Sequence, residues 1–136
     1  MFTVDLLGDV GNSLVEVDSK TDAEHIVVRE GTETIASNAF IHCQNIKSIT
    51  IPDSVTSIEN SAFYYCTNLK SINLPDNLTT IGMSAFSHCT ALTAIVIPDK
   101  VTTIEGAAFS GCSKAEYIII GESVVSIGSS AFSRCT

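Results

Sequence analysis

Apolar and polar positions along the chain follow a pattern that returns every 23 residues from Ile26 to Thr136. The clearest mark is Ala-Phe followed three residues later by Cys, and its phenylalanines are Phe40, Phe63, Phe86, Phe109 and Phe132. Columns of aliphatic residues keep the same step, and no insertion or deletion interrupts them. A constant period of about 20–29 residues with stacked aliphatic positions predicts a solenoid of repeating coils.

One repeat, residues 69–92, indicates what each coil forms. Residues 69–74 place apolar side chains two positions apart, which predicts a short strand with one inward face. Pro75 ends this strand because proline has no N–H to donate to a ladder. Residues 78–81 predict a second short extended segment. Within residues 85–92 the apolar positions share one helical face, so we expect one or two turns of α- or 3-10 helix there.

A single repeat cannot bury its apolar face alone, so neighbouring repeats must stack at the strand spacing of about 4.8 Å. We therefore expect residues 26–136 to form an α/β repeat solenoid of about five 23-residue rungs, the last one truncated. A parallel sheet occupies one face of it, and short extended segments and helical or 3-10 turns occupy the other. Residues 1–25 fall outside the register, and we expect strands at residues 2–7 and 14–18 that form a hairpin or a degenerate first coil and cap the N-terminal end of the core.

The composition narrows the classes of partner. At 136 residues the chain is long enough for one domain with a real core. The net charge of −8 argues against nucleic acid and anionic membranes as partners. No run of 18 apolar residues occurs, so no membrane span is expected.

The two ends of the sequence suggest further expectations. Residues 1–5 lack the basic start and long apolar core of a signal peptide, so no leader is visible. Residues 134–136 end the sequence in the middle of a repeat, which indicates a fragment or an open end that another molecule covers. Strand edges at such an end can pair with another chain, so we expect self-association through the C-terminal end.

The five cysteines follow the repeat, one in each. Their number is odd, no Cys-x-x-Cys pair exists, and a column of parallel side chains does not converge on a metal ion. We therefore expect five free thiols that pack in the core as small hydrophobic groups.

The unit from Leu69 to Cys89, which reads L-x-x-I-x-L-P, then L-x-x-I-G, then A-F-x-x-C, resembles the BspA-type, or treponemal-type, leucine-rich repeat. The resemblance covers residues 26–136, and its departures are mild, such as Gly121 where proline is usual. It implies a leucine-rich-repeat solenoid and a surface or secreted interaction protein, often one that attaches microbes to host molecules or to other cells. It carries over no functional residue, because the shared residues are core residues.

The strand face is the usual ligand surface in leucine-rich repeats, so outward-facing strand positions are the candidate ligand contacts. They are Thr50, Asn73, Val96, Tyr117 and Ile119. The last three are more apolar than exposure to solvent requires, which favours a patch that contacts a partner. The alternative is that β-branched residues simply suit strands.

A second outward column is acidic throughout, and we call it the acidic strip: Glu30, Asp53, Asp76, Asp99 and Glu122. It could attract basic partners or divalent cations. Calcium needs about six to eight converging oxygens, more than a straight row supplies, so we expect no metal site. The alternative is that these carboxylates cap turns by accepting hydrogen bonds from backbone N–H groups.

No catalytic arrangement is evident, because the sequence has no glycine-rich phosphate loop, nucleophile elbow or His-Glu-x-x-His. We therefore expect no enzyme and no cofactor, but a module that binds a protein or a glycan in adhesion or surface recognition. The family resemblance implies that it lies at the cell surface or is secreted. Two alternatives stay open: a cytoplasmic protein-interaction scaffold, and the targeting part of a larger enzyme.

Overall fold

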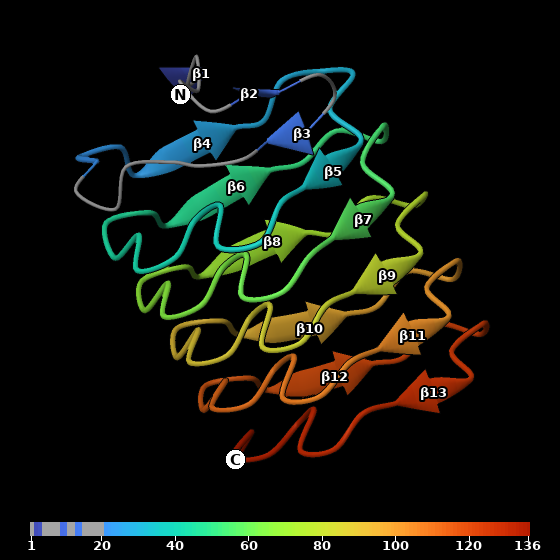
Figure 1. Ribbon diagram of the computed structural model, residues 1–136. Helices are drawn as coiled ribbons and strands as arrows, with labels where there is room; N and C mark the ends of the chain where they lie inside the picture. Colours follow the sequence, from blue (N-terminus) through green and yellow to red (C-terminus); the bar gives the residue numbers. More distant parts are fainter. Residues whose placement is uncertain (1, 4–8, 11–12, 15–20) are drawn as a thin grey trace.

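The computed structural model describes residues 2–3, 9–10, 13–14 and 21–136. The described chain winds as a solenoid in which two columns of short strands run from the N-terminal to the C-terminal end (Figure 1). Each 23-residue coil contributes one strand to each column, so the repeat read from the sequence is also the structural repeat.

The first column holds the strand face. Its members are β4 (His25–Val27), β6 (Ser48–Thr50), β8 (Ser71–Asn73), β10 (Ala94–Val96) and β12 (Tyr117–Ile119), with β1 (Phe2–Thr3) beside β4. The paired strands are parallel, and their partners lie 23 residues apart, as in Ile26 opposite Ile49. In β4, β6 and β10 the middle isoleucine is buried, so these strands turn one apolar side chain inward.

The second column forms a continuous seven-stranded sheet. From the C-terminal end its order is β13 (Ser126–Ile127), β11 (Thr103–Ile104), β9 (Thr80–Ile81), β7 (Ser57–Ile58), β5 (Thr34–Ile35), β3 (Ser13–Leu14) and β2 (Asp9–Val10). All its pairs are parallel except β2 with β3.

The N-terminal strands extend both columns by one step. β1 pairs with β4 in the first column, and β3 pairs with β5 in the second. β1 lies within the strand expected at residues 2–7, but β3 shares only Leu14 with the strand expected at residues 14–18, and β2 lies between the two expected strands. The rest of both expected ranges lies outside the described residues. That residues 1–25 act as a cap stays a prediction.

On the third side of each coil the expected helical turns are not confirmed, because the described residues contain no helix. Two positions in each coil adopt a left-handed backbone, with φ between 55° and 79°. They are Asn38, Ser61, Ser84, Ala107 and Ser130 at the first position, and His42, Tyr65, His88, Gly111 and Arg134 at the second. A left-handed residue cannot continue a right-handed helix. Two such residues, four positions apart in each coil, therefore prevent helix formation.

Hydrogen bonds in this third side run alternately within and between coils. In residues 38–43 the N–H groups of even-numbered residues donate to carbonyls of the next coil at 2.7–3.1 Å. The N–H groups of odd-numbered residues donate to carbonyls three residues earlier at 3.1–3.2 Å. We call this side the turn ladder, and it comprises residues 37–43, 60–66, 83–89, 106–112 and 129–135.

The core consists of stacked columns. The five repeat phenylalanines form one continuous stack, with ring centroids 4.9–5.5 Å apart and planes within 6° of parallel. Beside them lie the cysteines, all free, four of them buried and Cys135 half-buried. The thiols of Cys66, Cys89, Cys112 and Cys135 donate at 3.1–3.3 Å to the carbonyl of the phenylalanine 26 residues earlier. The prediction of free thiols is confirmed, and the prediction of burial is confirmed for four of the five.

Candidate binding site on the strand face

The first strand column is interrupted at one place, between β8 and β10. Its strands form a four-stranded sheet, β1-β4-β6-β8, and a separate pair, β10-β12. The Ile97 N–H donates to the Ile119 carbonyl at 2.8 Å, whereas among the described residues the equivalent bond is missing from Leu74 to Val96 and also from Ile51 to Asn73, although β6 and β8 pair. Just before the strands, the Thr93 N–H lies 3.4 Å from its acceptor in the previous coil, whereas the same bond in the next coil measures 2.8 Å.

The interruption is confined to the strand face. In the second column β9 pairs with both β7 and β11, and in the core Phe86 stacks on the phenylalanines of both neighbouring coils at 4.9 and 5.1 Å. The two coils therefore stay paired in the second column and stacked in the core, and what is missing is the pairing of β8 with β10. As a consequence Ile72 and Leu74 are only half-buried, although Ile95 and Ile97, at the same positions one coil later, are buried.

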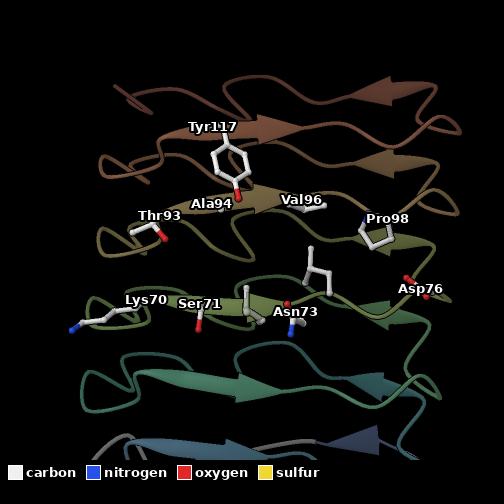
Figure 2. A pocket seen from close by; sticks show the side chains of 11 residues that line it. Lys70, Ser71, Asn73, Asp76, Thr93, Ala94, Val96, Pro98 and Tyr117 are labelled. Atoms are coloured by element: carbon white, nitrogen blue, oxygen red, sulfur yellow. The ribbon is translucent and has the colours of Figure 1, made fainter.

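A groove of about 310 Å³ lies along this interruption (Figure 2). One wall is formed by the coil of β8 and mixes the polar Lys70, Ser71 and Asn73 with the half-buried Ile72 and Leu74. The other wall includes Ala94 and Val96 of β10. Asp76 and Pro98 lie at the end of the groove where the chain leaves these strands.

Tyr117 completes the groove from one coil further along. Figure 2 shows its ring extending from β12 toward β10, with the hydroxyl group next to Ala94. Tyr117 and Ala94 are aligned in the register of β10 and β12, so the small alanine leaves room for the ring of the next coil. The hydroxyl end of the tyrosine is thereby directed toward the groove.

The groove brings together three of the five candidate contact residues. Asn73, Val96 and Tyr117 line it, whereas Thr50 on β6 and Ile119 on β12 are exposed on the same column but do not line it. The sequence did not point to Lys70, Ser71 or Ala94 as lining residues. The sequence signal for this part of the groove is that a small residue, Ala94, and a tyrosine, Tyr117, occupy equivalent positions in neighbouring repeats.

The acidic strip is exposed along its whole length. Asp76 lines one end of the groove. Asp99 accepts a hydrogen bond from the Glu122 N–H at 3.4 Å, which joins two neighbouring coils and does not cap the turn of Asp99 itself. Among the described residues no group of three or more His, Cys, Asp or Glu side chains lies close enough to hold a metal ion.

The groove combines polar and apolar side chains on both walls. The amino group of Lys70, the hydroxyl of Ser71 and the amide of Asn73 can donate or accept hydrogen bonds on one wall. Val96 and the ring of Tyr117 offer apolar surface on the other. An apolar surface with a few convergent polar groups is the usual composition of a ligand site.

The sequence model described as "BspA type Leucine rich repeat region" matches six copies over residues 18–136. The chain belongs to this family. The match includes all the strands from β4 to β13, so this BspA-type repeat architecture accounts for both strand columns and for the turn ladder.

Solved structures of bacterial leucine-rich repeat proteins have the same fold. A leucine-rich cell surface protein from Faecalibacterium prausnitzii is 36% identical over 91% of this chain, with a TM-score of 0.87. The leucine-rich repeat protein of T. pallidum is 31% identical over 90% of the chain, with a TM-score of 0.85. The pneumococcal vaccine antigen PcpA is 21% identical, with a TM-score of 0.78, and at that identity it shares the fold alone.

The chain spans 33% of the Faecalibacterium protein and 59% of the T. pallidum protein. No curated protein sequence matches it closely. Within the described part of the chain, no helix has the length and apolar character needed to span a bilayer.

Proposed function

We propose that this BspA-type chain is a non-enzymatic binding module that holds a protein or a glycan in the groove between β8 and β10. The observation that carries the proposal is the local separation of two coils that elsewhere remain stacked. Backbone pairing is lost at this one place, and both polar side chains and an aromatic ring face the space that results. The 36% identical relative, which is a cell surface protein, supports a location at the cell surface, and adhesion or surface recognition is the role that we propose there.

The outward apolar residues of β10 and β12 extend this contact surface. Val96, Tyr117 and Ile119 are all exposed, and together they continue the apolar surface of the groove toward the C-terminal coils. An apolar centre bordered by polar groups is typical of surfaces that bind partners. Tyr117 is the strongest single candidate, because tyrosine is common among residues that dominate binding energy.

A cytoplasmic scaffold is the other candidate function for the same groove. Free thiols are compatible with a reducing compartment, but four of these thiols are buried where they act as core groups, so they do not favour either compartment. The acidic strip is the second candidate contact surface, with Asp76 belonging to both surfaces.

The double variant Tyr117→Ala with Ile119→Ser tests the proposal. Wild type and variant are measured against immobilised host matrix proteins and a glycan panel, with Thr50→Ala as the control on the same strand column. We expect the double variant to bind at least tenfold more weakly and the control to bind as the wild type does, with unchanged circular dichroism in both. Unchanged binding by the double variant would contradict the groove and make the acidic strip the surface to test next, through Asp99→Asn.

A further inference from the structure

The strand-face groove carries opposite charges at its two ends. It follows β8 and β10 along their length, from Lys70 and Thr93 just before these strands to Asp76 and Pro98 just after them (Figure 2). Lys70 and Asp76 are exposed, and they are the charged side chains that line the groove in the described part of the chain. Six residues separate them, which at the rise of a strand corresponds to a distance of up to about 20 Å.

The end where the strands begin is positive. Lys70 has no ion-pair partner among the described residues, whereas Lys47, its equivalent one coil earlier, is held by Glu24 at 3.0 Å. The equivalent residue one coil later is the uncharged Thr93, and Glu116 follows in the coil after that. Of the charged side chains at this end, Lys70 alone lines the groove, so its ammonium group is available to a ligand.

The end where the chain leaves the strands is negative. Asp76 lines the groove there, and its neighbours in the acidic strip, Asp53 and Asp99, stand one coil away on either side. One cation is close by, because Nζ of Lys100 donates to Oδ1 of Asn77 at 2.7 Å. Three carboxylates and one ammonium group leave this end with a net negative charge, which favours a cationic group of a ligand.

Between the two charged ends the groove offers apolar surface. Ile72 and Leu74 are half-buried, and Val96 is 48% exposed. The ring of Tyr117 lies next to Ala94 (Figure 2). A ligand that follows the strands therefore meets an ammonium group first, then apolar side chains, and then a carboxylate.

This order of groups favours a polypeptide over other classes of ligand. A neutral sugar lacks both charges, and a nucleic acid lacks the cation. In an extended peptide, side chains at alternate positions lie on one face and the chain rises about 3.3 Å per residue. An acidic side chain and a basic side chain six residues apart therefore lie on the same face, at the separation of Lys70 and Asp76, with two positions of that face between them.

We propose, on the basis of the function proposed above for this groove, that its occupant is an extended segment of a partner protein with the pattern acidic-x-apolar-x-apolar-x-basic, in either chain direction. The acidic side chain pairs with Lys70 and the basic one with Asp76, and the two apolar side chains cover Val96 and the half-buried Ile72 and Leu74. Exposed ion pairs contribute little affinity, so the apolar contacts supply most of the binding and the charges select the segment.

The test uses blocked heptapeptides with a fluorescent label, and anisotropy measures their affinity for the chain. The first peptide has glutamate at position 1, valine at positions 3 and 5, lysine at position 7 and serine elsewhere. Peptides with glutamate at both ends or lysine at both ends should bind about fivefold more weakly. Replacing both valines by serine should weaken binding at least tenfold. NMR of the isotope-labelled chain locates the site through shifts of the Ala94 and Val96 methyl signals.

Two charge reversals should exchange these preferences. Asp76→Lys makes both ends of the groove positive, so this variant should prefer the peptide with two glutamates. Lys70→Glu makes both ends negative, so it should prefer the peptide with two lysines. The matched control is Glu33→Lys, which changes the net charge as Asp76→Lys does but lies beside β5 in the second column, and it should keep the preference of the wild type. An exchange of preference cannot result from a loss of folding, since each variant still binds one peptide best.

Three results would overturn the proposal. The first peptide could fail to shift the Ala94 and Val96 signals at millimolar concentration, or both charge reversals could keep the order of preference of the wild type. A methyl pyranoside could also shift these signals where the peptides do not, which would make the occupant a glycan and leave the groove as the binding site. Failure of the groove itself is a separate result: the variant with Tyr117→Ala and Ile119→Ser would then bind its ligands as the wild type does, whatever the heptapeptides do.

Discussion

The coils of residues 92–114 and 115–136 follow the same sequence pattern but bury it to very different extents. Ile97 is 2% exposed and Ile120, its equivalent, is 41% exposed; Ile104 is fully buried and Ile127 is 52% exposed. The first coil has neighbours on both sides in this chain, and the second has a neighbour on one side only. Burial in this solenoid is therefore produced by the adjacent coil and not by the residue type at a position.

The same comparison separates two kinds of exposed apolar residue. Ile120 and Ile127 are exposed because no coil of this chain lies beyond them, since their equivalents in the preceding coil are buried. Val96 is 48% exposed with coils on both sides, and the equivalent residue of β8, Asn73, is exposed too. The exposure of Val96 therefore results from the direction in which its side chain points. Only exposure of this kind, and not that of Ile120 or Ile127, indicates a contact surface.

The largest expected difference between the coils lies in the phenylalanine column. Phe86 is fully buried with rings at 4.9 and 5.1 Å on its two sides, so Phe86→Ala should lower the free energy of unfolding by about 3–5 kcal/mol. Phe132 is half-buried with one ring at 5.5 Å, so Phe132→Ala should cost clearly less. Urea unfolding of both variants measures the difference, and equal costs would mean that something covers the C-terminal coil.

The buried cysteines should make the free energy of unfolding depend on pH. Burial raises the pKa of the Cys112 thiol from 9.0 to about 12, and it raises the pKa of Cys89 as well. A thiol with a raised pKa in the folded state keeps its proton longer there, so its contribution is complete below about pH 9 and is lost as the pH rises toward 12. We expect the free energy of unfolding to fall over this range, and Cys112→Ala to fall less steeply than the wild type. Parallel curves for the two proteins would contradict this account.

Buried and half-buried cysteines should also differ in how fast they react with a thiol reagent. In denaturant a thiol reagent should modify all five cysteines. In the native protein near pH 8 it should modify the half-buried Cys135 first, because the other four are buried. Equal reaction of all five in the folded protein would contradict the buried column, and mass spectrometric detection of an intrachain disulfide would contradict the free thiols.

The 23-residue repeat predicted most of the fold, because every coil must bury the same apolar positions against its neighbours. Ile26, Ile49 and Ile95 are buried at the position that the aliphatic column predicted. The helical turns were expected because Ala85 and Cys89 share a helical face, and that spacing also suits the turn ladder. The residues that prevent a helix, such as Ser84 and His88, are not glycines, so the residue types gave no sign of a left-handed backbone.

The groove could not be predicted in the same way. Its two strands, Ser71–Asn73 and Ala94–Val96, carry the same apolar pattern as strands that do pair, so nothing in the pattern distinguishes them. The outward columns did predict which side chains face solvent, since orientation follows from alternation along a strand. Where two coils separate depends on side-chain packing across the coils, which no single repeat encodes.

The exposed end of the last coil should make this 136-residue chain self-associate. β12 and β13 each have one strand edge without a partner among the described strands, and Ile118, Ile120 and Ile127 are exposed beside those edges. We expect a concentration-dependent sedimentation coefficient, and a monomer when a polar capping repeat is added after Thr136. A monomer at high concentration without the added repeat would rule out this association.

The smallest expected effect is on ligand binding. It is tested with two exposed valines, one in the groove and one on the last coil. Val96 lines the groove, whereas Val125 is 85% exposed on the last coil and lies outside the groove. Val96→Ser removes apolar contact area and should weaken ligand binding about fivefold, which corresponds to roughly 1 kcal/mol, a little more than one buried methylene group. Val125→Ser should leave ligand binding unchanged, and both variants should unfold at the urea concentration of the wild type. If Val125→Ser weakened binding as much as Val96→Ser, the contact surface would lie on the C-terminal coil and not in the groove.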